Sequence, residues 1–320
     1  MVTLRLVLRK LAGGIPLVLG VTLISFVLMV YYGPDLTYTL LSKNPTAEEI
    51  ARVRAQLGYD QPFWWRYLDY LRELVTLDFG HSFSSGERVT SLLARTLPVS
   101  LALLAPGFVL GNLLGIGLGL LAAWHRGGWI DKTIMGFSVI GMSISFLVVI
   151  VACQTVFGVI LGWFPVRGWN VHDLPSYLYH VTVPTLASVF VALGYNTRFF
   201  RAVLVEELGR DHVRTARAFG AGPLSLMTKN VLMNAMIPIV TRVLFSIPLV
   251  VVSGSLLIES YFGIPGIGKA TFDAITSGDQ PVLKAVVGLT ALLFVVLLIA
   301  ADVLYTWLDP RVSLERSETA

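Results

Sequence analysis

The sequence predicts an all-α membrane protein with six transmembrane helices, and three observations lead to this fold class. Hydrophobic residues make up 55% of the 320 residues and charged residues only 14%, which is more apolar surface than one soluble core can bury. The mean hydropathy is +0.74. Six apolar runs are long enough to cross about 30 Å of hydrocarbon, and none has the alternation of a transmembrane barrel. Only helices then satisfy their own backbone hydrogen bonds in lipid.

The six apolar runs define the predicted spans. In chain order they are Leu11–Tyr31, Leu97–Ala123, Ile134–Leu161, Val181–Thr197, Ile237–Ile258 and Val282–Leu308. The first run is longer than the apolar part of a signal peptide, and no small-x-small cleavage site follows it. We therefore interpret it as an uncleaved first helix.

The positions of Lys and Arg predict the orientation of these spans. With a cytoplasmic N-terminus, most basic residues fall in the inside segments, whereas the two short outside loops hold only Arg167 and Lys269. Positive charge is retained on the cytoplasmic side of a membrane. The loop over 32–96 is exempt, because loops longer than about 60 residues escape this rule. Both termini are therefore expected to be cytoplasmic.

The long loop is expected to contain two helices. Asn44-Pro45-Thr46 followed by Glu48 and Glu49 is typical of a helix start, and a break is expected at Gly58 and Pro62. An aromatic cluster begins the second helix. It either forms an interfacial belt with local packing or offers a docking surface to an external partner. Its members are Phe63, Trp64, Trp65, Tyr67 and Tyr70.

The sequence lacks the groups that an enzyme or an ion-coupled carrier needs. The five histidines are scattered over loops, Cys153 has no second cysteine, and no HExxH, GxSxG or GxxxxGK[ST] motif is present. We therefore expect no catalytic residue, no metal site and no ATP site in this chain. The net charge of +4 is dispersed, which argues against a nucleic-acid partner.

Few charged residues occupy the apolar spans, which argues against proton or sodium coupling. The exceptions are Arg242, Lys284 and Asp302, each within one or two turns of a span end. Each either reaches the membrane surface or forms an ion pair between helices, or it lines a cavity.

The inside segment over 198–236 has a charged short helix. The pattern predicts a helix over Asp211–Phe219, closed by Gly220. Such a helix, lying along the membrane surface, is suited to a groove on a partner protein. The alternative is a solvated connector with ordinary inside charges.

This segment resembles the EAA coupling loop of ABC importer permeases, in the form found in the dipeptide, oligopeptide and nickel branch. The residues that carry the resemblance lie in VRTARAFGAGPLSLMTKNVLMNAMIPIV, where Ala216 and Gly220 match the second alanine and the glycine of the motif. Arg214 and Thr215 stand in place of its Glu and Ala, as in the peptide branch. Further counterparts extend over nearly the whole chain, including LGYDQPFWWRYLDYL, LDFGHSF, ESYFGIPGIGKATFDAI and DVLYTWLDPRV. The chain is thus similar to the first permease of peptide importers.

The resemblance implies a type I importer fold in the bacterial inner membrane. It implies an N-terminal tail and helix over 1–31, a periplasmic helical loop over 32–96, a five-helix core over 97–308 and a cytoplasmic tail over 309–320. The implied partners are a homologous second permease, two ATP-binding subunits, an extracytoplasmic substrate-binding protein and membrane lipids. ATP and magnesium would be bound by the partner subunits. Substrates would be di- or oligopeptides, or alternatively nickel chelates, glutathione or a peptide antibiotic; a membrane-embedded transferase is the distant alternative.

In this family the coupling loop docks on the ATP-binding subunit. The corresponding residues here are Arg210, Asp211, Arg214, Thr215, Ala216, Arg217, Ala218, Phe219, Gly220 and Ala221.

A translocation path for varied peptides is expected to offer few strong contacts. The candidate residues, small and polar within the second to fifth spans, are Ser143, Ser145, Asn196, Ser246 and Ser253. Ser145 stands where relatives usually have a proline, so the sequence gives no ground for assuming that the third span bends as theirs does.

The outer segment between the fifth and sixth spans combines glycines and a proline with aromatic residues, which favours a turn. A short helix should follow around Lys269, and Pro281 should lie in the first turn of the sixth span. The segment is either a connector or an external gate, in which case the carriers are Glu259, Phe262, Pro265 and Gly266. A carboxylate such as Glu259 needs a partner or water at this depth.

Overall fold

The computed structural model describes residues 2–33, 46–56 and 60–308, with side chains for 13–33, 46–55, 60–252 and 254–305. Its regular elements are helices, accompanied within the described residues by one isolated bridge between His81 and Arg88. The chain divides into two compact units. One combines residues 1–97 with 270–299, and the other combines 98–269 with 300–320.

The helices confirm an all-α fold with several spans. Five described helices are long and apolar enough to cross a membrane, or six if one bent pair counts as a single span. The bent pair replaces the predicted continuous span Ile134–Leu161. The predicted fourth span, Val181–Thr197, is the apolar middle of a longer helix, α8 (Leu174–Leu208).

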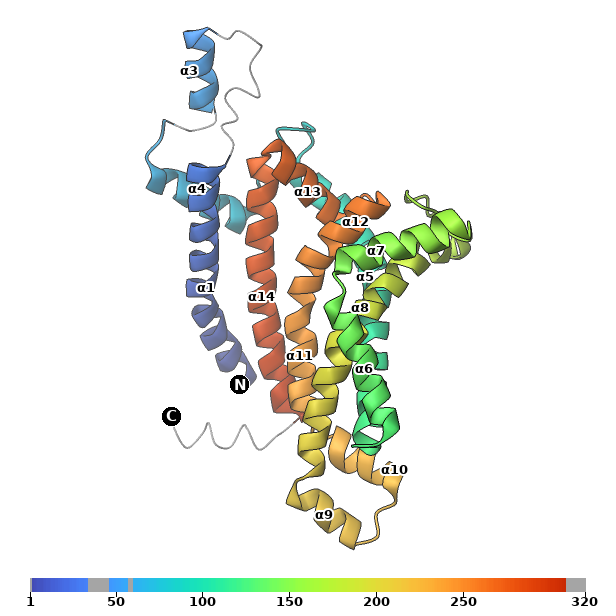
Figure 1. The fold of residues 1–320 in the computed structure, drawn as a ribbon. Coiled ribbons are helices and arrows are strands. Elements are labelled where there is room, and N and C mark those ends of the chain that lie inside the picture. The colour runs from blue at the N-terminus through green and yellow to red at the C-terminus, as the bar shows by residue number, and fades with distance from the viewer. Residues whose placement is uncertain (1, 34–45, 57–59, 309–320) are drawn as a thin grey trace. The chain divides into compact units, whose positions relative to one another are not determined.

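The first unit contains α1 (Val2–Tyr32), α3 (Ala47–Gln56), α4 (Phe63–Thr76) and most of α14 (Gln280–Leu308). In Figure 1, α4 lies across the end of α1 and reaches toward α14. Tyr67 donates a hydrogen bond to the Leu19 carbonyl of α1 at 2.9 Å. Tyr70 donates to the Lys284 carbonyl of α14, also at 2.9 Å. These tyrosines therefore attach α4 to both long helices.

The predicted pair of helices in the long loop is confirmed. Thr46 and Glu49 form a capping box, because each side chain accepts a hydrogen bond from the backbone of the other. The second helix begins after Pro62; Asn44, Pro45 and Gly58 lie outside the described residues.

The aromatic cluster contributes to packing. Phe63, Tyr67 and Tyr70 all contact the ring of Phe26, whereas Trp64 and Trp65 of the same helix are exposed. Burial of the Tyr70 hydroxyl raises its pKa above the usual value. Exposure of the two tryptophans is compatible with an interfacial belt and with a docking surface, so both interpretations stay predictions.

Of the three charged residues near span ends, Lys284 forms an ion pair. Its Nζ lies 2.6 Å from Glu73 Oε2, and it also lies over the Tyr70 ring. This outcome matches the helix-to-helix ion pair among the alternatives. Asp302 is buried.

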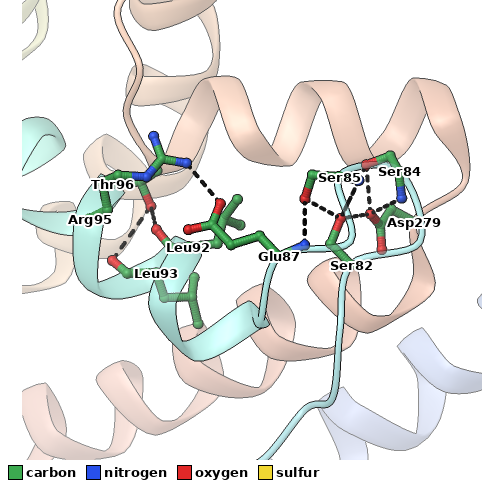
Figure 2. Close-up of polar contacts among 9 residues, drawn as sticks. All are labelled: Ser82, Ser84, Ser85, Glu87, Leu92, Leu93, Arg95, Thr96 and Asp279. Carbon is green, nitrogen blue, oxygen red and sulfur yellow. Dashed lines mark hydrogen bonds and ion pairs between the residues drawn. The ribbon is translucent and has the colours of Figure 1, made fainter.

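A serine-rich turn is joined to the start of α14 through Asp279, as Figure 2 shows. Asp279 is buried, and its Oδ2 atom accepts hydrogen bonds from Ser82 Oγ at 2.5 Å, Ser84 Oγ at 2.8 Å and Ser84 N at 3.1 Å. Ser85 Oγ in turn lies 2.9 Å from Ser82 Oγ. Residues almost 200 positions apart in sequence are thereby joined by one carboxylate.

Asp279→Ala is expected to loosen this turn. It leaves the Ser82 and Ser84 donors without their acceptor, at a cost of about 2 kcal/mol of unfolding free energy. Faster hydrogen exchange at the Ser84 amide and easier proteolysis over residues 80–88 would report the change. Asp78→Ala is the matched control, since the Asp78–Arg88 ion pair is over half exposed and exposed pairs contribute little. Equal exchange rates in the two variants would contradict the role of Asp279.

The second unit contains the remaining spans. Its helices include α5 (Val89–Trp124, from residue 98), α6 (Trp129–Ser143), α7 (Phe146–Cys153), α8, α11 (Met236–Leu249) and α12 (Ser255–Phe262). The unit also contains three π-helical segments. They are η1 (Gln154–Ile160) after α7, η2 (Leu226–Leu232) before α11, and η3 (Val250–Gly254) between α11 and α12. Asp173 caps α8 in a capping box with Ser176, and the hydrogen bonds from Ser176 hold the pKa of Asp173 below its usual value.

A row of glycines brings α5 and α8 into close contact. A Cβ atom on any of these glycines would come within 3.0 Å of an atom of α8. Small residues at spacings of four let transmembrane helices approach closely, which increases their van der Waals contact. The row consists of Gly107, Gly111, Gly115 and Gly119, opposite Ser188, Ala192, Asn196 and Phe200.

The third span bends by 95° between α6 and α7, although no proline is present at the bend. Ser145 there has φ −59° and ψ 137°, and this φ is the value that a proline ring imposes. Ile144 and Phe146 on either side pack against a buried core that includes Ile150 and Ile258. Packing of the flanking residues thus accompanies a bend that no proline predicts.

Candidate functional site

The predicted charged helix is α9 (Asp211–Ala218), close to the expected bounds. Phe219 caps it, and Gly220 has φ +81°, a value that favours glycine. The amide of Ala221 then donates to the Ala216 carbonyl at 3.1 Å. The sequence interpretation of a helix closed by Gly220 is therefore confirmed. Figure 1 shows α9 and α10 (Pro223–Ser225) together at one end of this unit.

The exposed surface of α9 carries most of the predicted coupling residues. Phe219 is 88% exposed and Leu224, shortly after it, is 66% exposed. Ala216 and Ala221 are half-buried, and the other predicted coupling residues are exposed, namely Arg210, Asp211, Arg214, Thr215, Arg217, Ala218 and Gly220. This surface combines cations with a large apolar ring, which suits a protein partner.

The opposite side of α9 is firmly packed. Val213 is buried in a core cluster with Phe200 and Leu204 of α8, Met227 of η2 and Ile239 of α11. The helix thus shares one buried apolar cluster with residues of two membrane spans. A displacement of α9 would reach α8 and α11 through this cluster, which includes η2.

Charged groups fix the junction between α8 and α9. Glu207, whose side chain is 5% exposed, lies 3.0 Å from Arg210 Nε and 3.2 Å from His212 Nε2. Further up α8, Arg201 forms a two-point ion pair with Asp131 of α6, with 2.5 Å for each contact. Asp131 also accepts a hydrogen bond from the Gly127 amide at 2.9 Å. The Asp131–Arg201 pair was not predicted from the sequence, because its members lie 70 positions apart and meet only in the fold.

A cavity of about 400 Å³ lies among α5, α7, α8, α11, η3 and α12. Of the predicted path residues, Asn196 and Ser246 line it. Ser143 and Ser145 are exposed but do not line it, and the side chain of Ser253 lies outside the described residues. The polar or charged lining residues that the path prediction missed are Asn112, Ser188, Tyr195 and Arg242. Arg242 therefore takes the cavity-lining alternative.

The predicted outer element forms a tight turn between α12 and α13 (Ile267–Ser277). Gly263 ends α12 with φ +67°, and Pro281 lies in the first turn of α14 as expected. Of the predicted gate residues, Glu259, Phe262 and Gly266 are buried and Pro265 is exposed.

The Glu259 carboxylate is bound by the start of α13. Its Oε1 accepts a hydrogen bond from Ser100 Oγ at 2.5 Å, and its Oε2 accepts one from the Lys269 amide at 3.0 Å. Ser100 Oγ also accepts from the Ile267 amide at 2.7 Å. A carboxylate at a helix N-terminus satisfies amides that have no partner within the helix. The chain itself thus supplies the partners that Glu259 needs, so its burial gives no separate support to a water-filled gate, and the gate remains a prediction.

Two glycines allow this close approach. A Cβ atom at Gly266 would overlap the Glu259 carboxylate, and one at Gly268 would overlap the backbone of Ser255. The glycine pattern that indicated a turn therefore has a second reason, which is contact between α12 and the start of α13.

Arg167 and Gln154 hold the other side of the turn. Arg167 donates to the carbonyls of Tyr261 at 3.0 Å and Ser260 at 3.2 Å, and Gln154 donates to the Val166 carbonyl at 2.6 Å. This end of the unit is therefore a hydrogen-bonded assembly of two loops.

Glu259→Ala is expected to destabilise the protein by about 2–3 kcal/mol, because it leaves buried hydroxyl and amide donors unsatisfied. Glu259→Gln keeps one acceptor oxygen and should lose less. Thermal unfolding of the protein in detergent micelles measures both variants. Glu206→Ala, which removes an exposed carboxylate of the same unit, is the control. A Glu259→Ala protein as stable as this control would refute the anchoring role.

Among the residues that the structure describes, no group of three or more His, Cys, Asp or Glu side chains could hold a metal ion.

Comparison with known proteins gives two family matches. Residues 115–314 match the family described as binding-protein-dependent transport system inner membrane component. Residues 3–104 match the N-terminal membrane component of the same systems.

Curated relatives extend over the whole chain. A Brucella abortus protein, provisionally named a peptide transport system permease protein, is 31% identical over 311 residues, covering 96% of this chain and 98% of that protein. The dipeptide transport system permease protein DppB of Bacillus subtilis is 30% identical over 314 residues, covering 98% and 99%. Among solved structures, an inward-facing form of the MetNI methionine ABC transporter aligns with a TM-score of 0.57 at 21% identity, covering 69% of this chain and 97% of the matched chain. At this level of identity, the structural match shows a similar fold and nothing further.

Proposed function

Because this chain belongs to the family of binding-protein-dependent transport system inner membrane components, we propose that it forms half of the translocation path for di- or oligopeptides in an ATP-driven importer. It is a multi-pass membrane permease. The peptide substrate is taken from relatives named for peptide or dipeptide transport, which it matches nearly end to end.

One observation carries the transport mechanism. The exposed side of α9 offers Phe219 and arginines to a partner, while Val213 on its buried side shares an apolar cluster with residues of η2, α8 and α11. The cavity lies among the same two spans and their neighbours. A partner that displaces α9 would therefore reshape the cavity walls, which is what alternating access requires.

The proposed complex supplies what this chain lacks. Of two ATP-binding subunits, one would dock on α9 and the other on the second permease; both would hold ATP and magnesium, and hydrolysis would occur there. A homologous second permease would complete the path, and an extracytoplasmic binding protein would deliver the substrate. The termini and α9 would face the cytoplasm of a bacterial inner membrane, as the Lys and Arg distribution predicts.

Uptake by the reconstituted complex tests this function. The permease pair, the ATP-binding subunits and the loaded binding protein are placed in proteoliposomes with ATP inside. We expect ATP-dependent accumulation of a radiolabelled dipeptide that stops when the binding protein is omitted. Accumulation of a nickel chelate or glutathione, with no uptake of any peptide, would reassign the substrate within the same architecture.

A further inference from the structure

Arg242 is a cation without a matching anion in the cavity of the second unit. It lies on α11, six residues after the first residue of that helix, or about 9 Å along the helix axis. Its Nε atom is buried and has no hydrogen-bond partner among the described residues. Among the residues that the structure describes, no acidic side chain lines the cavity. Because an arginine stays charged at any physiological pH, its guanidinium requires an acceptor or water.

Among the described residues, no hydrogen bond joins Arg242 Nε to the other polar groups that line the cavity. Ser188 and Ser246 donate to carbonyls of their own helices. Asn112 donates to the Phe108 carbonyl at 2.8 Å, and Asn196 donates to Asn112 Oδ1 at 3.1 Å. The hydrogen bond between Asn196 and Asn112 joins α8 to α5. Arg242 is left as the strongest donor facing a largely apolar space.

The guanidinium is also held in position. Its central carbon lies 5.4 Å from the centre of the Phe199 ring, in a cation–π contact. A guanidinium carries its N–H groups in one plane, which suits a carboxylate with two oxygens. The contact with Phe199 therefore restricts where the guanidinium lies before any anion arrives.

We propose that Arg242 binds the C-terminal carboxylate of the peptide as it passes through the cavity. This inference rests on the proposed function, since a free α-carboxylate is the anion that peptides of any sequence share. A volume of about 400 Å³ lies in the range of small-molecule sites, which runs from about 300 to 1,000 Å³. A single charged contact in an otherwise apolar cavity orients the peptide and still permits release, as transport requires.

The test compares a dipeptide with its C-terminal amide. The uptake rate of each peptide by the reconstituted complex is divided by the fraction of the binding protein that carries that peptide. This normalisation removes any preference of the binding protein for one of the two peptides. We expect Arg242→Gln to lower the ratio of acid to amide uptake about tenfold, which corresponds to about 1.4 kcal/mol. Arg242→Lys, which keeps the charge without the planar pair of donors, should lower it about threefold.

Lys132→Gln is the matched control, because Lys132 is an exposed cation of α6 outside the cavity; its ratio should equal that of the unmodified complex. An equal loss of acid and amide uptake in the Arg242 variants would overturn the proposal and point to pairing with a carboxylate of the second permease. An unchanged ratio in Arg242→Lys would also overturn it, even if Arg242→Gln failed to assemble. Failure of the unmodified complex to take up either peptide would instead refute the proposed function.

Discussion

Replacing Phe219 by alanine is expected to leave the protein folded and inserted in the membrane. The affinity of the permease for its ATP-binding subunit should fall about 30-fold. Phe219 is 88% exposed at the end of a charged helix, and it adds nothing to the buried cluster around Val213. Truncating an aromatic anchor of an interface costs about 2 kcal/mol, which is about 30-fold in affinity. Transport should then fall at least about tenfold at limiting concentrations of the ATP-binding subunits.

Co-purification of the ATP-binding subunits measures the affinity, and the number of peptides imported per ATP hydrolysed measures coupling. Phe137→Ala is the matched control, since Phe137 on α6 is 71% exposed and lies away from α9. Gly220→Pro provides a second probe, because a proline cannot adopt the φ of +81° found there. Normal co-purification and coupling by Phe219→Ala would show that α9 is not the contact.

Local sequence patterns predicted α9 and the turn after α12 well. Charges, a short helical stretch and a terminal glycine are sufficient to define α9, because capping by Gly220 involves residues within one turn. Pro281 at the start of α14 follows from the same kind of local rule. The membrane-spanning helices were also located from the sequence, because the hydropathy of a segment depends only on its own residues.

The charged and polar partners could not be predicted in this way. Glu259 is bound by Ser100, which is 159 positions away, and Asp279 is bound by Ser82, which is 197 positions away. No spacing rule relates such residues. The bend at Ser145 was hidden for a similar reason, because tertiary packing, and not a proline, accompanies it.

The residues predicted for a translocation path overlap only in part with those that line the cavity, and the path itself stays a prediction. Asn196 and Ser246 were expected from their small polar side chains, and they line it. Ser143 and Ser145 were chosen by the same criterion, but the bend of the third span places them elsewhere. Arg242 carried two open interpretations, and only the three-dimensional arrangement assigns it to the cavity wall.

Asp131→Ala is expected to destabilise the second unit by about 3 kcal/mol, the largest stability effect among these variants. The Asp131 side chain is 5% exposed and that of Arg201 is 24% exposed. Removing one partner leaves the other charge partly buried and unpaired, which costs about 3–5 kcal/mol in a buried pair. The lower end applies because Arg201 keeps some contact with water.

A double-mutant cycle separates the ion pair from simple loss of packing. Asp131→Leu and Arg201→Met should each be strongly destabilising, whereas the double variant should recover much of the loss because no unpaired charge remains. Glu206→Ala is the control, since the Glu206–Arg210 pair is exposed and spans 3.9 Å. Thermal unfolding in micelles measures the unmodified protein, the two single variants, the double variant and the control. Strictly additive losses of stability in the double variant would contradict the pairing.

The same cycle has a functional readout. Asp131 joins α6 to α8, and α8 leads directly into the junction with α9. If the pair makes α6 and α8 move together, the double variant should fold yet import fewer peptides per ATP hydrolysed than the unmodified complex. Recovered stability with fully recovered coupling would mean that the ion pair only holds the fold, and that Val213 and its apolar neighbours transmit the motion of α9 without it.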